Sequence, residues 1–235
     1  KNPFYKNQKI YDFVAMTPTQ AFHSLPELGK VRKLIIGGAY VSVALQKALL
    51  NAKVNAFETY GMMETLSHIA VRNMKDPISE FRCLPEFQVR QDERKCLVID
   101  APKLKIENLI TNDEVEVFDS KHFRLIGRID NMIEIGSLKL NPEQIERKLS
   151  ENLSFHYFID TYSDSPSNKK LVLVVKFDQK IKLEKIHQQI KNCVSLEDYE
   201  IPKAIVCFEN FIQTHSGKIK RKSTMKQNPY RILNL

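Results

Sequence analysis

The sequence predicts an α/β protein in which a layered sheet and a small barrel-like group of strands are followed by a small α+β domain. Three changes of pattern along the chain indicate this fold class. Over residues 13–59, short apolar runs alternate with amphipathic segments, as in a parallel sheet covered by helices. Over residues 67–125 the helical period disappears, and after residue 128 helix-like and strand-like segments mix again. We therefore expect two domains, formed by residues 1–127 and 128–235.

The layered part is expected to contain three strands and two helices. Pro18 at a first helical position and Ser42 as an N-cap set the predicted helix starts. The predicted strands are 13–16, 33–36 and 54–57, and the predicted helices are 19–22 and 42–50. The third strand would deliver Tyr60 and Gly61 to the carboxyl edge of the sheet, where open α/β sheets bind ligands.

The next part of the chain alternates apolar and polar residues between turn-forming residues. The expected strands are 68–72, 87–90, 96–99 and 114–118. This pattern is typical of antiparallel strands or a small barrel.

The last hundred or so residues have a typical size for one domain. Here Asn141-Pro142 predicts the start of a helix that continues through Leu149. Further strands are expected at 154–161, 171–177 and 204–208, and a further helix at 181–194.

Composition limits the possible partners. The chain has 235 residues, of which 43% are apolar, which is ample for a packed core. Lys and Arg exceed Asp and Glu by 36 to 28, a net charge of +8, so an anionic partner such as a nucleotide or coenzyme A is plausible. Basic and aromatic residues do not alternate regularly along the chain, as they would in a surface that stacks and binds nucleic acid. We therefore expect no nucleic-acid partner.

The cysteines and the apolar runs indicate a cytoplasmic protein. The 4 cysteines form no C-x-x-C pair, so they are expected to be buried, reduced thiols. No apolar run approaches membrane-spanning length, and the N-terminus lacks a signal-peptide core. The oligomeric state is left open, with a homo-oligomer among the alternatives. Because the first residue is Lys1, the chain is expected to be a piece of a longer protein.

Two glycine-containing segments suggest a nucleotide site. Gly37-Gly38-Ala39 follows an expected strand, and its bare backbone would let a flat ring approach, although an ordinary strand-to-helix turn is the simpler alternative. The second segment is Tyr60-Gly61-Met62-Met63-Glu64-Thr65. An aromatic face suits a purine and a carboxylate suits a hard cation. Its alternative is a strand-end turn with an incidental glutamate.

A basic segment near the C-terminus suggests a catalytic lysine. Gly217 would let the backbone turn tightly, so that Lys218 could reach away from its own domain into a neighbouring site. The alternative is a solvated basic stretch, since residues 218–222 are rich in Lys and Arg.

In their order and separation, these three segments and Gly127-Arg128-Ile129-Asp130 resemble the adenylate-forming superfamily of acyl- and aryl-CoA synthetases. The resemblance covers nearly the whole chain. It implies a reaction in two steps, in which a carboxylic acid and ATP form an acyl-adenylate and coenzyme A then takes the acyl group. The implied cofactors are ATP, Mg²⁺ and coenzyme A, and the implied C-terminal domain is mobile.

The resemblance also implies roles for individual residues. The implied nucleotide contacts are Gly37, Gly38, Ala39, Tyr60, Gly61, Asp113 and Arg128, with Asp113 and Arg128 at the ribose. Glu64 would hold Mg²⁺ and Lys218 would be catalytic. Asp130 would be the hinge of the small domain, and Gly136 would flank the coenzyme A channel. For Asp113, a solvated acidic turn is the alternative.

The chain departs from the superfamily pattern at several points. Met63 stands where a threonine should meet the α-phosphate, and a thioether cannot donate a hydrogen bond. That contact is therefore missing or comes from Thr65 or a backbone N–H. The glycine-rich phosphate loop is absent, so the chain resembles a C-terminal part. His68 and Met62 are candidates for the acid pocket, although a lone histidine on such a strand is more often structural.

Within the superfamily, the segments 14–20 and 34–39 and the compact strand region look most like the o-succinylbenzoate-CoA ligases of menaquinone biosynthesis. The alternatives are another aryl- or fatty-acyl-CoA synthetase or an amino-acid adenylating module. A non-catalytic nucleotide- or nucleic-acid-binding protein is the alternative from a different class.

Overall fold

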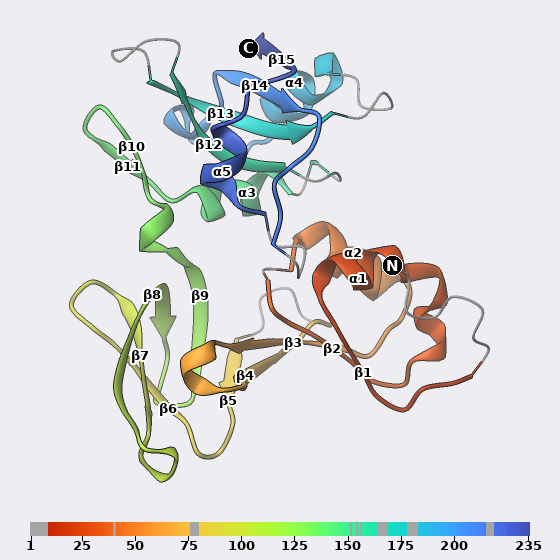
Figure 1. Ribbon diagram of the computed structural model, residues 1–235, viewed down its shortest axis with the longest axis vertical. Helices are drawn as coiled ribbons and strands as arrows, with labels where there is room; N and C mark the ends of the chain where they lie inside the picture. The colour runs from red at the N-terminus through yellow and green to blue at the C-terminus, as the bar shows by residue number, and fades with distance from the viewer. Residues whose placement is uncertain are drawn as a thin grey trace. The chain divides into compact units, whose positions relative to one another are not determined.

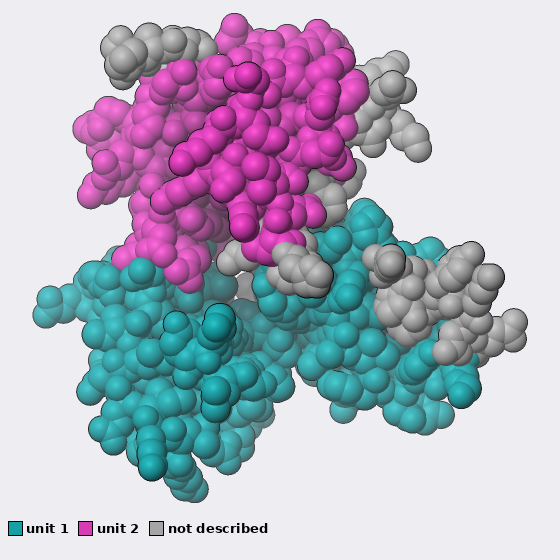
Figure 2. Space-filling model, in the orientation of Figure 1, with its two compact units in different colours: residues 1–126 teal, residues 127–235 magenta. Residues whose placement is uncertain are grey.

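The computed structural model describes residues 9–39, 41–75, 80–150, 152–153, 155, 157–163, 169–177, 183–214 and 219–235. The chain divides into two compact units, Lys1–Ile126 and Gly127–Leu235, which Figure 2 distinguishes by colour. Each unit buries apolar side chains of its own.

The first unit is built on one nine-stranded sheet with the order β1-β2-β3-β4-β5-β9-β8-β7-β6 (Figure 1). Its strands are β1 (Val14–Met16), β2 (Leu34–Ile36), β3 (Ala56–Gly61), β4 (His68–Asn73), β5 (Phe81–Cys83), β6 (Gln88–Gln91), β7 (Cys96–Ala101), β8 (Ile106–Val117) and β9 (His122–Arg128). The pairs β1–β2 and β2–β3 are parallel, and β3–β4 begins the antiparallel part. The region expected to be antiparallel strands or a small barrel is thus the continuation of one sheet.

Two helices of the first unit begin where their capping residues predict. These are α1 (Pro18–His23) and α2 (Val43–Asn51), and the short 3-10 turns are η1 (Leu25–Lys30), η2 (Met63–Thr65) and η3 (Pro102–Leu104). The Thr17 hydroxyl accepts from the Gln20 N–H while the Gln20 side chain accepts from the Thr17 N–H, and Ser42 accepts from the Leu45 N–H. These bonds satisfy N–H groups that the first helical turn leaves unpaired.

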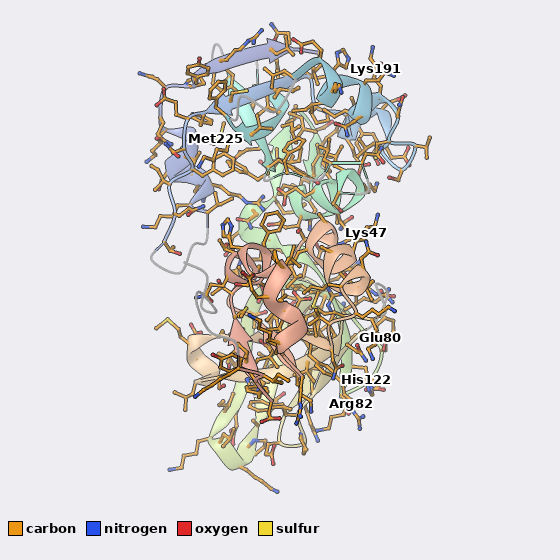
Figure 3. The ribbon with its side chains drawn as sticks, turned by 90° about the vertical axis from the view of Figure 1, so that its right-hand side faces the viewer. Lys47, Glu80, Arg82, His122, Lys191 and Met225 are labelled. Carbon is orange, nitrogen blue, oxygen red and sulfur yellow. The ribbon has the colours of Figure 1, made fainter. Side chains whose placement is uncertain are left out.

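The first unit has two core clusters. The helices pack against the parallel strands through buried residues such as Ala21, Leu45 and Leu34. The antiparallel part has its own cluster, in which Phe81 and Phe123 stack at 5.4 Å between ring centroids. On the same two strands, Arg82 and its register partner His122 lie beside each other (Figure 3).

Within its described residues, the second unit contains a four-stranded sheet, a hairpin and three helices. Its strands are β10 (Ile133–Ile135), β11 (Leu138–Leu140), β12 (Tyr157–Ser163), β13 (Lys169–Lys176), β14 (Ala204–Phe208) and β15 (Arg231–Asn234). Its helices are α3 (Pro142–Leu149), α4 (Leu183–Lys191) and α5 (Arg221–Met225), with the 3-10 turns η4 (Ile129–Asn131) and η5 (Asp198–Glu200).

The sheet of the second unit, β12-β13-β14-β15, buries both of its faces. Alternate residues of β13 divide between two clusters, because successive side chains of a strand point to opposite faces. Leu173 joins the cluster that contains Ile145 of α3 and Ile186 of α4. Val174 joins the cluster on the other face, which Met225 of α5 covers.

Several observed elements differ from the sequence expectations. Tyr60 and Gly61 lie inside β3 instead of beyond it, and Asp113 lies inside β8 instead of on a solvated turn. The helix expected over 181–194 is α4 (Leu183–Lys191). Elements that the sequence did not predict are β5, β9, β15 and α5.

The cysteines are buried and unpaired, as their scattered positions predicted. Burial raises the pKa of the Cys83 thiol to about 11, so this group stays protonated near neutral pH. Among the described residues, no helix is long and apolar enough to cross a membrane.

Candidate active site

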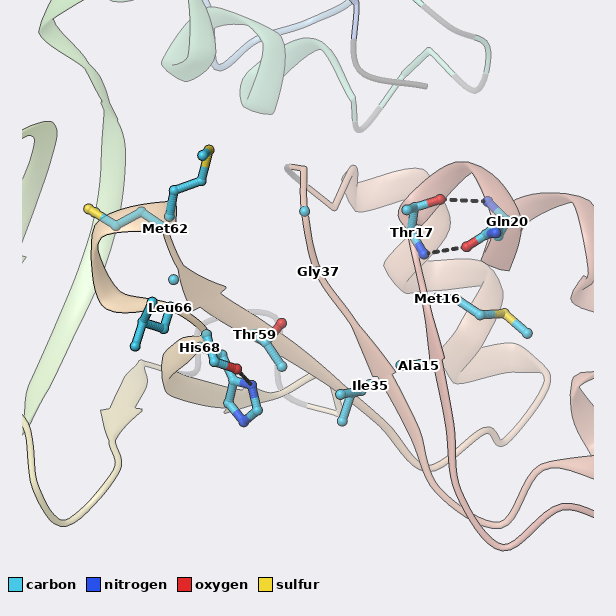
Figure 4. A pocket seen from close by; sticks show the side chains of 14 residues that line it. Ala15, Met16, Thr17, Gln20, Ile35, Gly37, Thr59, Met62, Leu66 and His68 are labelled. Atoms are coloured by element: carbon cyan, nitrogen blue, oxygen red, sulfur yellow. Dashed lines mark hydrogen bonds between the residues drawn. The ribbon is translucent and has the colours of Figure 1, made fainter. Parts of the chain in front are cut away.

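A pocket of about 570 Å³ opens at the carboxyl ends of β1, β2 and β3 (Figure 4). Parallel strands end at one edge of a sheet, so the loops that follow them meet there. The lining residues are Ala15, Met16, Thr17, Gln20, Ile35, Gly37, Gly38, Thr59, Gly61, Met62, Met63, Leu66, Ser67 and His68. The pocket therefore joins the Gly37 segment to the segment that follows Tyr60, and a nucleotide as its ligand stays a prediction. Sequence reasoning missed Thr17, Gln20 and Thr59, which carry only capping or strand signals.

The two glycines of the first segment serve different purposes. A Cβ on Gly37 would overlap the hydroxyl of Thr59 on the neighbouring strand. A side chain at Gly37 would therefore force the Thr59 hydroxyl to move. Gly38 has a φ of +83°, and a Cβ there would meet nothing within 4 Å. Gly38 therefore supplies the turn and leaves open space beside the backbone.

Gly61 allows the chain to fold back sharply after β3. A Cβ on Gly61 would overlap the Ser67 carbonyl and the His68 Cα, and the β3–β4 register shifts between Tyr60 and Gly61. Leu66 has a φ of +63°, and the Ser67 N–H donates to the Thr65 carbonyl at 2.7 Å. A leucine with positive φ in a three-residue turn is strained backbone, and such strain concentrates at functional sites.

Thr65 holds this turn together from inside. Its side chain is 4% exposed, and its hydroxyl accepts from the Met62 N–H at 3.1 Å. The same oxygen lies 3.0 Å from the Met62 carbonyl and 2.8 Å from the Ser67 carbonyl, either of which can accept its proton. Thr65 is therefore committed to the turn, which argues against it as the substitute phosphate ligand. Met63 is 90% exposed and Glu64 is exposed, so both are accessible to a ligand.

The polar end of the pocket is formed by Ser67 and by His68, the first residue of β4. The Ser67 Oγ lies 3.3 Å from the His68 Nδ1, the bond drawn in Figure 4. The Thr17 and Gln20 pair lies on the opposite side of the pocket in the same view. His68 and Met62, both candidates from the sequence, thus line one cavity.

Tyr60 is placed differently from the expected adenine-stacking position. It is 9% exposed and does not line the pocket, because its ring packs edge-on against Phe123 at 5.3 Å and against Phe81 at 5.9 Å. Its hydroxyl donates to the Asp113 Oδ2 at 2.6 Å. Asp113 is itself 6% exposed. This short bond to a carboxylate links β3 to β8 inside the first unit.

Of the predicted site residues that the structure describes, Arg128, Asp130 and Gly136 belong to the second unit. There the Arg128 Nη2 donates to the Asp130 Oδ2 at 2.7 Å. Both side chains are about two-fifths exposed, at 42% and 43%. Gly136 has a φ of +59° in the turn between β10 and β11, a conformation that glycine adopts without strain.

Lys218 lies outside the described residues. On either side of it, Gln213 forms an antiparallel bridge with Ile219, and the Lys220 N–H donates to the Ile212 carbonyl at 2.8 Å. Within the described part of the chain, no three His, Cys, Asp or Glu side chains group together as a metal site.

No family model matches the sequence. Solved structures show that the fold is that of the AMP-forming acyl-CoA synthetases. The o-succinylbenzoate CoA synthetase of Bacillus subtilis, solved with its acyl-adenylate intermediate, is 16% identical with a TM-score of 0.75, over 95% of this chain and 52% of that chain. An AMP-forming acyl-CoA synthetase-like protein from Dyadobacter fermentans is 29% identical with a TM-score of 0.50, over 96% and 68%. The predicted fold class and superfamily resemblance are confirmed at the level of the fold.

Two curated proteins match this chain, each at 22% identity. A linear gramicidin synthase protein of Brevibacillus parabrevis is 22% identical over 243 residues, which covers 86% of this chain and 3% of that protein. The 2-succinylbenzoate–CoA ligase of Haemophilus influenzae is 22% identical over 194 residues, which covers 73% of this chain and 40% of that ligase. The chain thus spans less than half the length of either curated relative.

Proposed function

We propose that this chain is part of an AMP-forming acid–thiol ligase. The enzyme activates a carboxylic acid with ATP as an acyl-adenylate and passes the acyl group to a thiol. The observation that carries the proposal is the pocket at the carboxyl ends of β1–β3, bounded by Gly37 and Gly38 on one side and the turn after Gly61 on the other. The fold shared with acyl-CoA synthetases supports the same chemistry.

In this proposal the nucleotide lies against the Gly37 segment and the first-unit carboxylate Asp113. Gly38 and Ala39 present backbone to the adenine, and Asp113 accepts hydrogen bonds from the ribose, with Arg128 as the second ribose ligand. Because Tyr60 is enclosed and donates to Asp113, its role is to orient this carboxylate.

Glu64 is the proposed protein ligand of Mg²⁺. A magnesium ion on a nucleotide commonly uses one or two carboxylates and takes its other ligands from phosphates and water, so one exposed glutamate fits this role. The bound ion would neutralise phosphate charge. A Bacillus subtilis o-succinylbenzoate CoA synthetase has been solved with ATP and a magnesium ion.

The second unit is proposed to supply the remaining functions. Lys218 neutralises charge on the carboxylate and phosphate oxygens during adenylation. Asp130 is the hinge about which the small domain turns between the two steps, and Gly136 flanks the channel for coenzyme A.

The specific acid is proposed to be o-succinylbenzoate, with coenzyme A as the acceptor. Support comes from the likeness to the Bacillus subtilis structure and the Haemophilus ligase. An amino-acid adenylating module is the second candidate, because the gramicidin synthase match covers 86% of this chain. A carrier-bound phosphopantetheine acceptor in place of free coenzyme A would identify that second candidate.

The test of the proposed function is Lys218→Ala in the complete protein, with each half-reaction measured separately. Loss of one preorganised electrostatic contact typically lowers a rate about 10²–10³-fold. We expect a loss of that order in acyl-adenylate formation, while supplied acyl-adenylate is converted to thioester at close to the normal rate.

Lys220→Ala and Lys222→Ala are the matched controls, and both are expected to be mild. If all three variants slow both half-reactions to the same small extent, the segment is only a solvated anion-attracting stretch and the catalytic assignment is wrong.

A further inference from the structure

The chain on both sides of Lys218 is tied to the short helix α5. On the far side, the Lys220 N–H donates to the Ile212 carbonyl at 2.8 Å. On the near side, the Ile212 N–H donates to the hydroxyl of Thr224, a buried residue of α5, at 3.1 Å. Because Lys218 lies only two residues before Lys220 in the sequence, the position of α5 limits where Lys218 can lie.

The helix α5 depends on the rest of the second unit for its position. It spans only Arg221–Met225, and no side chain caps its first turn. Isolated helices shorter than about 12–15 residues are marginal in water, so contacts outside the helix must hold it in place. Met225 packs against the cluster on one face of the sheet, and Arg221 supplies a contact to α3, which lies beside α5 in Figure 1.

Arg221 contacts two carboxylates of α3. Its Nη2 donates to the Glu146 Oε2 at 2.9 Å, and its Nη1 lies 2.7 Å from the Oε1 of the same group. The Glu143 Oε1 lies 3.8 Å from the Arg221 Nη2, and the guanidinium carbon lies 5.6 Å from the centre of the Phe158 ring. A planar guanidinium that meets a carboxylate at two points fixes orientation as well as distance, which a lysine cannot reproduce.

Glu143 connects this arrangement to the turn that contains Asp130. Its Oε1 accepts from the side-chain amide of Asn131, and Asn131 is the last residue of η4. The helix α3 therefore holds the turn of the proposed hinge at one end of the network. Through Arg221 it also holds α5, at the base of the Lys218 segment.

We propose that Arg221 is a positioning residue for adenylation, because by fixing α5 to α3 it sets the place from which Lys218 reaches the reacting carboxylate. This inference rests on the proposed ligase function and adds to it a residue that does not touch the substrate. In that function Lys218 acts only in adenylation. A residue that works through Lys218 therefore affects adenylation alone, whereas a residue that merely stabilises the unit affects both half-reactions.

The test measures each half-reaction separately in the complete protein. Pyrophosphate release reports adenylation, with the acid that the wild type adenylates fastest among o-succinylbenzoate, benzoate, fatty acids and amino acids. Thioester formation is followed from supplied acyl-adenylate. A misplacement of about 1 Å can lower a rate about 10²-fold. We expect Arg221→Lys to slow adenylation about 10- to 100-fold through kcat, with little change in the KM for ATP, and to form thioester at close to the normal rate.

Glu146→Gln disturbs the same contact from α3, because an amide nitrogen replaces one of the two oxygens that face the guanidinium. We expect a smaller loss in the same half-reaction. Urea unfolding shows which variants are folded, and Glu146→Gln carries the test if Arg221→Lys does not fold. The inference is overturned if a folded variant of either kind keeps the wild-type adenylation rate, or if it slows both half-reactions equally.

The double variant Lys218→Ala/Arg221→Lys shows whether Arg221 works through the lysine. In the Lys218→Ala background, Arg221→Lys should slow adenylation no further, because the group that it positions is gone. Losses that multiply in the double variant mean that Arg221 acts independently of Lys218, which also overturns the inference.

Lys148→Met is the matched control, because it breaks another ion pair of α3 that does not involve α5. The Lys148 Nζ lies 2.6 Å from the Glu200 Oε2, and the two side chains are 32% and 10% exposed. This variant should lower the free energy of unfolding but leave the ratio of the two half-reaction rates unchanged. A ratio that falls as far in Lys148→Met as in Arg221→Lys overturns the inference.

Failure of the proposed function has a different signature. A wild-type protein that forms no acyl-adenylate from any acid overturns the ligase proposal, and this inference with it. If Lys218→Ala leaves adenylation unchanged, the catalytic assignment is wrong and Arg221 has nothing to position. Normal adenylation by the wild type, a large loss in Lys218→Ala and no loss in folded Arg221→Lys overturn this inference alone.

Discussion

At the scale of single residues, Gly37 lies beside the pocket as the sequence suggested, but the structure gives a different physical reason for a glycine at this position. The sequence suggested that a bare backbone there would admit a flat ring. In the structure the space beside Gly37 is filled by the Thr59 hydroxyl, and Gly38 is the position that faces open space. The glycine pair could be predicted from its place between a strand and a helix. The Thr59 contact could not, because it depends on the register of two strands far apart in the sequence.

Gly37→Ala is predicted to destabilise the first unit by about 1–3 kcal/mol, the usual cost of overpacking a well-packed site. The added methyl group would overlap the Thr59 Oγ1. Thr59→Ala removes that oxygen, so the double variant Gly37→Ala/Thr59→Ala should recover most of the loss. The measurement is the free energy of unfolding in urea.

Gly29→Ala is the matched control, because a Cβ there meets nothing within 4 Å. A double variant no more stable than Gly37→Ala alone would show that backbone conformation, and not the Thr59 contact, requires the glycine.

In the turn after Gly61, too, some features could be predicted from the local sequence and others could not. A turn at the end of a strand was one of the two interpretations of the Gly61 segment, and His68 and Met62 were recognised as pocket candidates. The role of Thr65 was not predicted. Its hydroxyl is enclosed by the turn that it stabilises, and a single hydroxyl on a sequence gives no sign of whether it faces a ligand or its own backbone.

At the scale of the elements, β3 and β4 are joined by a buried ion pair. Glu58 and Arg72 are register partners across the two strands, and the Arg72 Nε donates to the Glu58 Oε2. Their side chains are 6% and 14% exposed. The other oxygen of Glu58 accepts from the Val41 N–H at 3.4 Å, so the pair also restrains Val41 just before α2.

Breaking this pair is predicted to cost more than replacing it. Glu58→Gln leaves the arginine charge buried beside a neutral amide, and removal of one partner of a buried pair typically costs about 3–5 kcal/mol. The double variant Glu58→Leu/Arg72→Met leaves no buried charge and should be much closer to the wild type in free energy of unfolding. A double variant as unstable as the sum of Glu58→Leu and Arg72→Met measured separately would mean that the two side chains act independently.

Helices and strands could be predicted from the sequence where short segments determine them. The capped starts of α1, α2 and α3 and the apolar run of β14 were predicted, because caps and continuous apolar strands are properties of short segments. The three-residue strand β5 was missed. Its pairing with β4 and β9 determines it, and three residues carry too little periodicity to predict a strand.

At the scale of the whole molecule, the two units have separate cores, and the second unit contains a buried carboxyl group with a raised pKa. In the second unit Glu146 is buried, and burial raises the pKa of its carboxyl to about 7, against the opposing effect of Arg221. The Arg221 Nη1 lies 2.7 Å from the Glu146 Oε1, and the Ile159 N–H donates to the same oxygen at 2.8 Å. Glu143 lies nearby, with its Oε1 3.8 Å from the Arg221 Nη2, and its charge also raises the pKa of Glu146.

This burial predicts that the second unit loses stability as the pH rises. The folded state holds the Glu146 proton up to a pH of about 7, whereas the unfolded chain releases it near the ordinary value of 4.5. Between these values the folded state binds more protons, so its free energy of unfolding should fall by about 1–3 kcal/mol as the pH increases. Hydrogen exchange at β13 and β14 amides, corrected for intrinsic rates, measures this change.

Glu146→Gln should flatten the pH dependence at β13 and β14, and amides of β2 and β3 in the first unit are the internal control. A fall in Glu146→Gln as steep as in the wild type would assign the effect to another group, such as Asp160, whose pKa burial also raises.

The strand order of the first unit also has a consequence for how the chain acquires its fold during synthesis. β5 pairs with β9, while β6, β7 and β8 lie beyond β9 in the same sheet. As the protein leaves the ribosome, β5 therefore emerges with one edge unpaired, and its partner is translated only after β6–β8. The strands β6, β7 and β8 pair with their neighbours in sequence and can form first, because local closure costs less chain entropy. Until β9 is complete, the open edge of β5 can pair with another copy of the nascent chain.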